Sequence, residues 1–366
     1  MKKRQFKRIS IEIFVIIFSG LAIFFCSTHN ESLYKQTIGN VVSVKNGKRE
    51  SVTDEYNNKD YQTTQTVNLQ IMNGKDKGKY VELKNTYSQS GALDQKLNKN
   101  QKIFIELHHT NGKLTAVFMY SKRDTYLLML CWLVIVLLYI MMQIKGIRTI
   151  LSVTINFILF LIFVQLDVNL NITYFFWLFA LSALLFTALS LIIVIGWNRQ
   201  CAITFVAIVF GTTLGLVIGW SILELTNSQG VHYEALDMAT QAPKQLFFAA
   251  TLIGLLGAVM DAATDIVSTL FEMKENTPNI SQKQLFLSGR QVGRAIMGPL
   301  INVLFLIFFA ETFAMAVLYF RTNNTYSFTF AWTMSLGVVQ SLISGIGIVL
   351  VIPTASYLCS RLLGGK

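Results

Sequence analysis

The sequence predicts an α-helical membrane protein with about eight transmembrane helices and a small extracytoplasmic β-domain, a barrel or a sandwich, after the first helix. Of the 366 residues, 53% are hydrophobic and only 14% are charged, whereas a soluble domain carries about a quarter charged residues. Long, nearly uncharged runs recur, and one polar, lysine-rich block separates the first run from the rest. We therefore expect three parts: a basic tail and first transmembrane helix (1–26), a β-rich domain (27–124) and a seven-helix transmembrane domain (125–366).

The first element combines a basic tail, MKKRQFKR, with an apolar run from Ile9 to Cys26. This order is typical of a secretory signal or an uncleaved signal anchor. No small-residue cleavage site stands out after the run, which favours an uncleaved helix and leaves cleavage as the alternative.

The polar block shows strand patterns. Apolar and polar residues alternate in TVNLQIM (66–72), and a second short run (80–84) follows a glycine-containing turn. Two further runs, 102–109 and 114–120, flank the dipeptide Asn-Gly, which is a hairpin signal. These patterns predict about five or six antiparallel strands.

Seven more apolar runs follow the polar block, and each reaches, within boundary error, the ~20 residues that cross the hydrocarbon core of a bilayer. They lie at about 125–143, 149–166, 172–196, 201–223, 246–270, 295–319 and 329–353.

The basic residues predict the orientation of these helices. If the N-terminus is cytoplasmic, the cytoplasmic segments hold 14 Lys and Arg residues, and the short outer loops hold only Lys244 and Arg321. This bias favours cytoplasmic N- and C-termini and an extracytoplasmic block at 27–124. The block at 27–124 holds 15 Lys and Arg against 10 Asp and Glu, which explains much of the net charge of +11. The distribution of charge favours membrane topology, so the lipid bilayer is the expected partner and nucleic acid is not.

Acidic residues interrupt one of the apolar runs, GAVMDAATDIVSTLFEM (257–273). Asp261, Asp265, Ser268 and Glu272 step by four, three and four, which places them on one helix face. A charge in hydrocarbon costs roughly 2.5–3.5 kcal/mol on insertion scales, so we expect this face to look into the bundle, toward partners or water. The alternative is that Glu272 and Asp265 are solvated at the cytoplasmic surface.

Two other helices carry polar residues at a similar depth. At ~1.5 Å per residue, Asp261, Asn302 and Ser344 each lie roughly 12–13 Å from the cytoplasmic boundary, which predicts a polar layer between three helices. Gln340 belongs to the same small, polar face of the last helix as Ser344, and Glu311 is a second candidate buried acid.

The connection before residue 295 carries its own signals. The pattern S-x-x-Q at 281–284 is a capping box that predicts a helix start. Arg290 and Arg294 lie four apart beyond it, and we expect ion pairs with Asp265 and Glu272 at the inner surface. The alternative is that both arginines only flank the membrane on its positive side.

Glycines at a spacing of four predict close helix packing. Gly298 and Pro299 predict an interrupted helix, because proline cannot donate to the preceding turn; such a break serves either a binding site or a packing kink. The predicted packing positions are Gly211, Gly215, Gly219, Gly289, Gly293, Gly298 and Pro299.

Motifs for catalysis and cofactor binding are missing from the sequence: it has no CxxC, Walker, nucleophile-elbow, HExxH or dinucleotide motif. We therefore predict no catalytic residue, no metal site and no cofactor. The missing nucleotide motif also argues against an ATP-driven pump within this chain alone.

Three segments resemble the YibE/F family of multi-pass bacterial membrane proteins: KGIRTILSV (145–153), GLLGAVMDAATDIVSTLFEM (254–273) and LFLSGRQVGRAIMGPLINVLF (285–305). The resemblance covers nearly the whole chain and implies a bacterial cytoplasmic membrane, one N-terminal helix, an extracytoplasmic β-domain and a seven-helix block. The family typically carries an acid just after the GR of the last segment, where this chain has Ala295. The resemblance implies no particular activity.

Two functions follow from these features. The first is a permease-like or transport-accessory protein in which Asp261 and its neighbours handle a small solute, an ion or a proton. The second is a non-catalytic envelope scaffold whose β-domain binds an envelope protein or a second copy of the chain. An intramembrane enzyme is a weaker third reading, because the acids lack the paired motifs of such enzymes.

Overall fold

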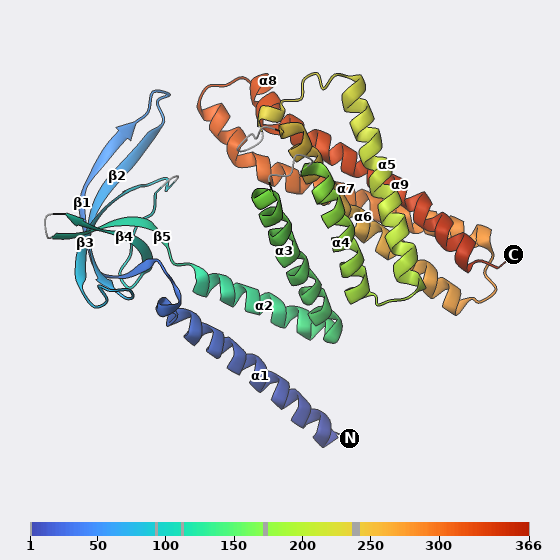
Figure 1. Cartoon of the computed structure of the whole chain (residues 1–366), viewed down its shortest axis with the longest axis horizontal. Coiled ribbons are helices and arrows are strands. Elements are labelled where there is room, and N and C mark those ends of the chain that lie inside the picture. Colours follow the sequence, from blue (N-terminus) through green and yellow to red (C-terminus); the bar gives the residue numbers. More distant parts are fainter. Residues whose placement is uncertain (1, 92–93, 111–112, 171–174, 236–241, 366) are drawn as a thin grey trace. The chain divides into compact units, whose positions relative to one another are not determined.

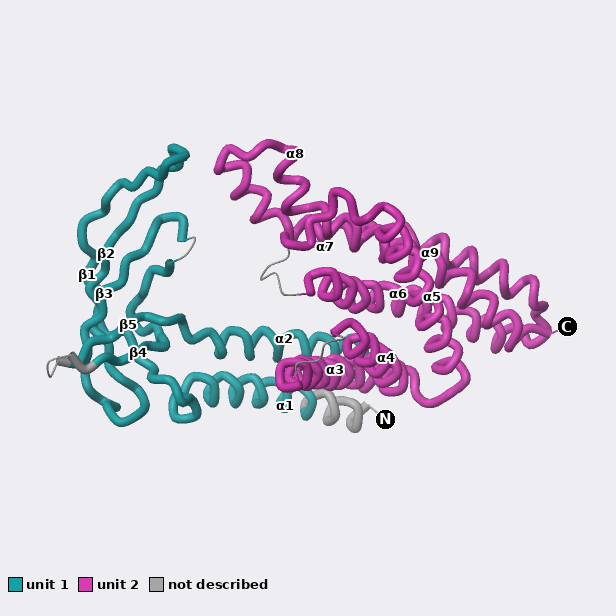
Figure 2. The backbone as a smooth tube through the Cα atoms, turned by 45° about the horizontal axis from the view of Figure 1, so that its top comes forward, with its two compact units in different colours: residues 1–143 teal, residues 144–366 magenta. Residues whose placement is uncertain are grey.

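The computed structural model describes residues 2–91, 94–110, 113–170, 175–235 and 242–365. The chain forms two compact units, Met1–Gln143 and Ile144–Lys366 (Figure 2). Between them, Gln143 takes a left-handed backbone conformation, φ 50°, at the end of a helix.

Unit 1 contains a closed five-stranded β-barrel with strand order β1-β2-β3-β5-β4. Neighbouring strands are antiparallel except for the short parallel contact between β3 and β5. The predicted small β-domain is confirmed, and its form is a barrel rather than a sandwich. The strands are β1 (Thr37–Thr53), β2 (Lys59–Ile71), β3 (Tyr80–Ser88), β4 (Lys102–Thr110) and β5 (Lys113–Ser121).

The alternating pattern of β2 explains the barrel core. Val67, Leu69 and Ile71 are buried inside, next to residues of the other strands. Gln65 continues the same inward face, and its buried amide bonds to the backbone of Leu97 through both its oxygen and its nitrogen. The polar side chain is therefore satisfied within the core, as buried polar groups generally are.

The sequence patterns did not indicate β1 as a strand. Its Asn46-Gly47 dipeptide looks like a turn, but the strand continues through a register shift between Asn46 and Arg49. A Cβ atom on Gly47 would lie 3.1 Å from the carbonyl oxygen of Thr64, so glycine permits the close approach of β2 at this irregularity.

Two helices of unit 1 flank the barrel in the sequence, α1 (Lys2–Thr28) and α2 (Asp124–Met142). They lie side by side (Figure 1), and the Trp132 indole donates to the Ser19 hydroxyl at 3.0 Å. The ring of Trp132 also covers Gly20, where a Cβ atom would lie only 2.7 Å from it.

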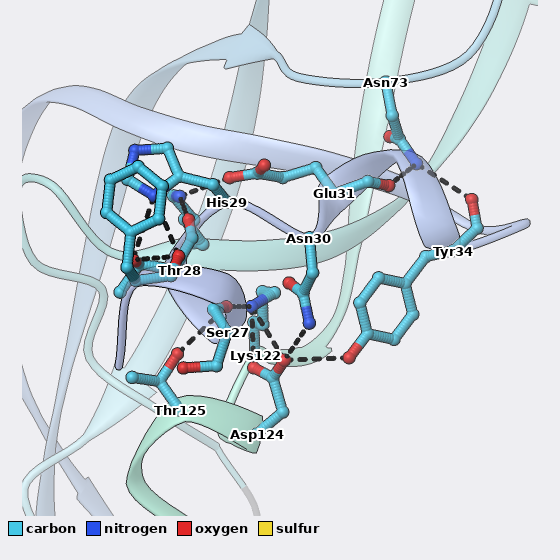
Figure 3. Close-up of polar contacts among 12 residues, drawn as sticks. Ser27, Thr28, His29, Asn30, Glu31, Tyr34, Asn73, Lys122, Asp124 and Thr125 are labelled. Atoms are coloured by element: carbon cyan, nitrogen blue, oxygen red, sulfur yellow. Dashed lines mark hydrogen bonds and ion pairs between the residues drawn. The ribbon is translucent and has the colours of Figure 1, made fainter. Parts of the chain in front are cut away.

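A polar junction joins the end of α1, the barrel and the start of α2 (Figure 3). The Lys122 ammonium donates to the Ser27 carbonyl oxygen at 2.7 Å and pairs with Asp124. The Lys102 ammonium donates to the Thr28 carbonyl oxygen and pairs with Glu31, which begins the short 3-10 helix η1 (Glu31–Leu33). These contacts hold both helices against the base of the barrel.

Unit 2 is helical. Its helices are α3 (Ile144–Leu170), α4 (Phe175–Val194), α5 (Arg199–Leu225), α6 (Pro243–Asn276), α7 (Gln282–Arg321), α8 (Tyr326–Thr329) and α9 (Ser335–Leu363), with a 3-10 turn η2 (Tyr233–Ala235) and a π-helical turn η3 (Phe330–Met334). Counting α8 to α9 as one span, the described chain has eight helices long and apolar enough to cross a membrane. The predicted number of spans is confirmed.

Helix α6 lies at the centre of unit 2 and packs against α4, α5, α7 and α9. Its face with Leu255, Val259, Ala262 and Ile266 is fully buried. The glycine stripe of α5 lies against α9, where Cβ atoms on Gly211, Gly215 and Gly219 would come within 3.0 Å of Val351, Gly347 and Ile343, respectively.

Helix α7 begins as the capping box predicts: the Ser281 hydroxyl accepts from the Gln284 amide, and the Gln284 side chain accepts from the Ser281 amide. The predicted interruption at Gly298 and Pro299 is wrong, because Pro299 lies inside a continuous helix of 40 residues. Proline removes one backbone hydrogen bond, and a helix tolerates this loss where neighbouring groups adjust.

The glycines of α7 differ in their surroundings. A Cβ atom on Gly289 would meet Ser356 and Leu270, and one on Gly293 would meet Ile352. Gly298 has nothing within 4 Å of such an atom, so it makes no close helix contact.

Candidate functional site

The acidic face of α6 lies opposite the buried face of that helix. Asp261, Asp265 and Glu272 are exposed, as are Gly254 and Gly257 on the same face. The acids therefore share one face, but this face does not point into the helix core of unit 2. The apolar face of α6 packs into the helix core of unit 2 instead.

The other members of the predicted polar layer lie in different surroundings. Asn302 is exposed on α7, and Ser344 is buried on α9. Among the described residues, no hydrogen bond joins either of them to Asp261, so the layer stays a prediction.

The predicted inner-surface ion pairs also stay a prediction. Arg290 and Arg294 are exposed, and no ion pair within the described ranges joins them to Asp265 or Glu272. The Arg290 guanidinium lies 5.9 Å from the centre of the Phe286 ring instead.

Two of the predicted residues, Gln340 and Ser344, line a cavity of about 700 Å³ in unit 2. Its walls come from α6, α7 and α9, with the turns η2 and η3. Glu311, the second candidate buried acid, lines the same cavity, but its side chain is exposed and not buried as predicted. The structure thus brings together polar residues from two helices, α7 and α9.

Close contacts at two glycines shape this cavity. A Cβ atom on Gly337 of α9 would lie 2.0 Å from the Phe308 ring of α7, so the glycine lets the two helices touch at the cavity wall. Gly254 of α6 lies beside Gln340, where a Cβ atom would be 3.1 Å from the amide nitrogen Nε2. Gly254 also belongs to the exposed face that carries Asp261.

The π-helical turn η3 places Trp332 and Thr333 on the cavity. A π-helical turn holds one more residue than an α-helical turn, and such turns are frequent at functional sites. The Thr329 hydroxyl, just before the turn, is buried and has no hydrogen-bond partner within the described chain.

The serines of α9 differ in how their hydroxyl groups bond. Ser356 and Ser360 donate to backbone carbonyls of their own helix, as does Thr354. Ser341 and Ser344 are only 7% and 2% exposed and line the cavity, yet none of the hydrogen bonds found among the described residues involves their hydroxyls. These two hydroxyls are free to bond to whatever occupies the cavity.

The charged side chains in the described lining are Glu234 and Glu311. Glu311 has no ion pair or hydrogen bond to the described part of the chain. Glu234 pairs with the imidazole of His232 at 3.0 Å, and this ring stacks on Trp332 at 4.6 Å. The backbone amide of Glu234 and the His232 side chain lower the pKa of the Glu234 carboxyl, so the carboxylate stays ionised near neutral pH.

Comparison with protein families assigns both parts of the chain. Residues 130–365 match the model of the YibE/F-like protein, and residues 32–119 match the YibE/F family N-terminal domain. The chain belongs to the YibE/F family. No curated protein and no solved structure matches it.

In this YibE/F protein, the boundary between the two family matches differs from the boundary between the two compact units. The YibE/F-like match begins inside α2, whereas α2 packs against α1 and belongs with the barrel to unit 1. Both segments that carry the strongest sequence resemblance, 254–273 and 285–305, lie in α6 and α7. Each of them contributes a residue to the cavity, Gly254 and Leu304.

Proposed function

We propose that this YibE/F protein is a permease-like or transport-accessory protein of the bacterial cytoplasmic membrane that binds a small solute in the cavity of unit 2. One observation carries the proposal: the hydroxyls of the buried Ser341 and Ser344 and the carboxylate of the exposed Glu311 line one cavity, and none of them has a hydrogen-bond or ion-pair partner among the described residues. An unmade hydrogen bond of a buried group costs about 1–3 kcal/mol. Water or a solute in the cavity would supply the missing bonds.

The acids of α6 extend this proposal into a route for a solute, an ion or a proton. The distribution of Lys and Arg favours an orientation in which Glu311 lies nearer the outer ends of the helices and Glu272 nearer the cytoplasm. Gly254 lines the cavity, and Asp261 follows on the same α6 face roughly 10 Å further along the helix. In this proposal Asp261 and Asp265 continue the polar surface toward the cytoplasm.

Thiol accessibility tests whether the cavity holds water. In a variant whose four native cysteines are replaced by serine or alanine, Ser341→Cys and Ser344→Cys should react with a small, charged methanethiosulfonate reagent. Ile343→Cys is the matched control, because Ile343 lies between them in the sequence but packs against Gly219. If all three thiols are equally inert in folded protein, the proposed binding cavity is refuted.

A second proposal, the envelope scaffold, rests on exposed aromatic side chains of the barrel. Tyr56 and Tyr61 are exposed at the β1–β2 hairpin, where a partner could contact them. Under this proposal, Tyr56→Ser with Tyr61→Ser abolishes co-purification of a crosslinked envelope protein, while Glu311→Gln leaves it unchanged. If both variants retain the crosslinked partner, the hairpin is not its binding surface.

A further inference from the structure

We infer that the cavity between α6, α7 and α9 binds a small organic cation, an ammonium or guanidinium group attached to an apolar body. This inference deepens the proposed function and rests on it. It names the chemical class of the solute that the proposed function leaves open.

The charge of the cavity lining indicates the charge of the ligand that would bind there. Two carboxylates, Glu234 and Glu311, face the cavity, and its described lining contains no Lys, Arg or His. Glu234 already has His232 as a partner, but Glu311 has none among the described residues. Glu311 is exposed on a helix long and apolar enough to cross a membrane, and a charge in hydrocarbon costs roughly 2.5–3.5 kcal/mol on insertion scales. A cationic ligand would supply the missing countercharge.

The aromatic side chains of the lining favour the same class. Phe247, Phe308, Tyr319 and Trp332 contribute to the cavity wall. The faces of aromatic rings attract cations within about 6 Å of the ring centre, and tryptophan does so most strongly. Recognition of quaternary ammonium groups uses such aromatic rings.

The size of the cavity favours an organic cation over a metal ion as the ligand. Its volume of about 700 Å³ falls within the 300–1,000 Å³ that is usual for small-molecule sites. The described residues contain no group of three His, Cys, Asp or Glu side chains arranged to hold a metal ion. An inorganic ion would leave most of the cavity and its rings without contact.

The polar groups opposite the acid complete the site. The Ser341 and Ser344 hydroxyls can accept hydrogen bonds from an ammonium or guanidinium N–H, and so can the Gln340 amide oxygen. Glu311 lies on α7 and these three residues lie on α9, so a bound cation would contact both helices.

A matched pair of probes tests the inference. Benzyltrimethylammonium carries a positive charge, and neopentylbenzene has nearly the same shape without it. Binding of both to the full-length protein in nanodiscs of zwitterionic lipid is measured by isothermal titration calorimetry, with phenylacetate as the anionic probe. We expect the cation to bind at least about tenfold more tightly than the other two, a difference of about 1.4 kcal/mol.

Substitutions then locate the bound cation. Glu311→Gln should weaken binding of benzyltrimethylammonium at least tenfold, while Glu275→Gln, an exposed acid near the end of α6, should leave it unchanged. If Glu311→Gln does not fold, two other variants replace it. Glu311→Asp keeps the charge, and Phe308→Leu removes an aromatic ring. Glu311→Asp should bind benzyltrimethylammonium more tightly than Phe308→Leu does.

The outcomes separate this inference from the proposed function. Failure of every probe to bind, equal binding of cation and neutral probe, tighter binding of phenylacetate, or displacement by sodium ions alone would each overturn the organic cation. If the thiols at 341 and 344 still react with the charged reagent, the solute cavity itself stands. If they do not react, the proposed function fails together with the inference.

Discussion

The Lys122 ammonium donates to the carbonyl oxygen of Ser27 at 2.7 Å, although the two residues lie 95 positions apart in the sequence. The side chain of Lys122 is only 3% exposed, and Asp124 is its counterion. Lys122 lies two residues before the start of α2 and holds the last turn of α1 (Figure 3). In the sequence, the barrel lies between these two helices.

Removal of this lysine should destabilise unit 1. In Lys122→Met the buried end of Asp124 and the Ser27 carbonyl lose their common partner, and breaking a buried pair costs about 3 kcal/mol. Thermal unfolding of the purified protein, followed by the near-ultraviolet signal of the barrel, measures the loss. Lys79→Met is the control, because its pair with Asp76 is mostly exposed on the lysine side. Equal midpoints for the two variants would contradict the prediction.

The junction should also respond to acid. Burial raises the pKa of the Glu31 carboxyl, but the hydrogen bond and charge of Lys102 lower it more, so the net pKa lies below the ordinary value of 4.5. A carboxyl with a lowered pKa stabilises the fold above its unfolded pKa and loses this contribution as the pH falls through the folded value. We expect the amides around the junction to lose protection against exchange, measured relative to the intrinsic exchange rate at each pH, below about pH 4.5.

Glu31→Gln is the control for this acid response. The variant lacks the titrating group, so the protection of its junction amides, relative to the intrinsic exchange rate, should depend less on pH between 6 and 3 than that of the native protein. An unchanged pH profile would show that other groups cause the effect.

The contact between α5 and α9 should not tolerate a methyl group. A Cβ atom on Gly215 would lie 3.0 Å from the Cα atom of Gly347, so Gly215→Ala forces two backbones apart. Overpacking of this kind costs typically 1–3 kcal/mol, which thermal unfolding in detergent can detect. Gly345→Ala has nothing within 4 Å of the new atom and should be neutral or slightly stabilising. A loss of stability in Gly345→Ala but not in Gly215→Ala would refute this packing.

Filling the cavity should block access to its serines. Gly254→Leu introduces a side chain into the lining beside Gln340, so labelling of Ser344→Cys should slow several-fold. Gly257→Leu lies on the same face of α6, but a Cβ atom there has open space, and it should leave the rate unchanged. Equal rates in the two variants would place Ser344 outside the cavity.

The helices and the hairpin of β4 and β5 were predictable because their signals are local: long apolar runs and, at 111–112, an Asn-Gly dipeptide that lies outside the described residues. β1 was not, because the same dipeptide at Asn46 and Gly47 lies within a strand and not at its end. Whether such a pair turns the chain depends on the strand beside it, which a local pattern does not include.

The candidate site was predictable only in part, for a similar reason. Helical periodicity groups Asp261 and Asp265 on one face, but it does not say which face meets the neighbouring helices. Gln340, Ser344 and Glu311 were visible as polar residues in apolar runs. Trp332 and Phe308 were not, because a π-helical turn and a contact with Gly337 bring them to the cavity.

Only two residues, Lys122 and Arg123, separate the end of β5 from the start of α2, and both Lys122 and Lys102 bond to the end of α1. This connection is short and hydrogen-bonded, so it restricts motion of the barrel relative to the two helices. A force that displaces the barrel would therefore also displace the α1–α2 pair, because a short and hydrogen-bonded connection joins them.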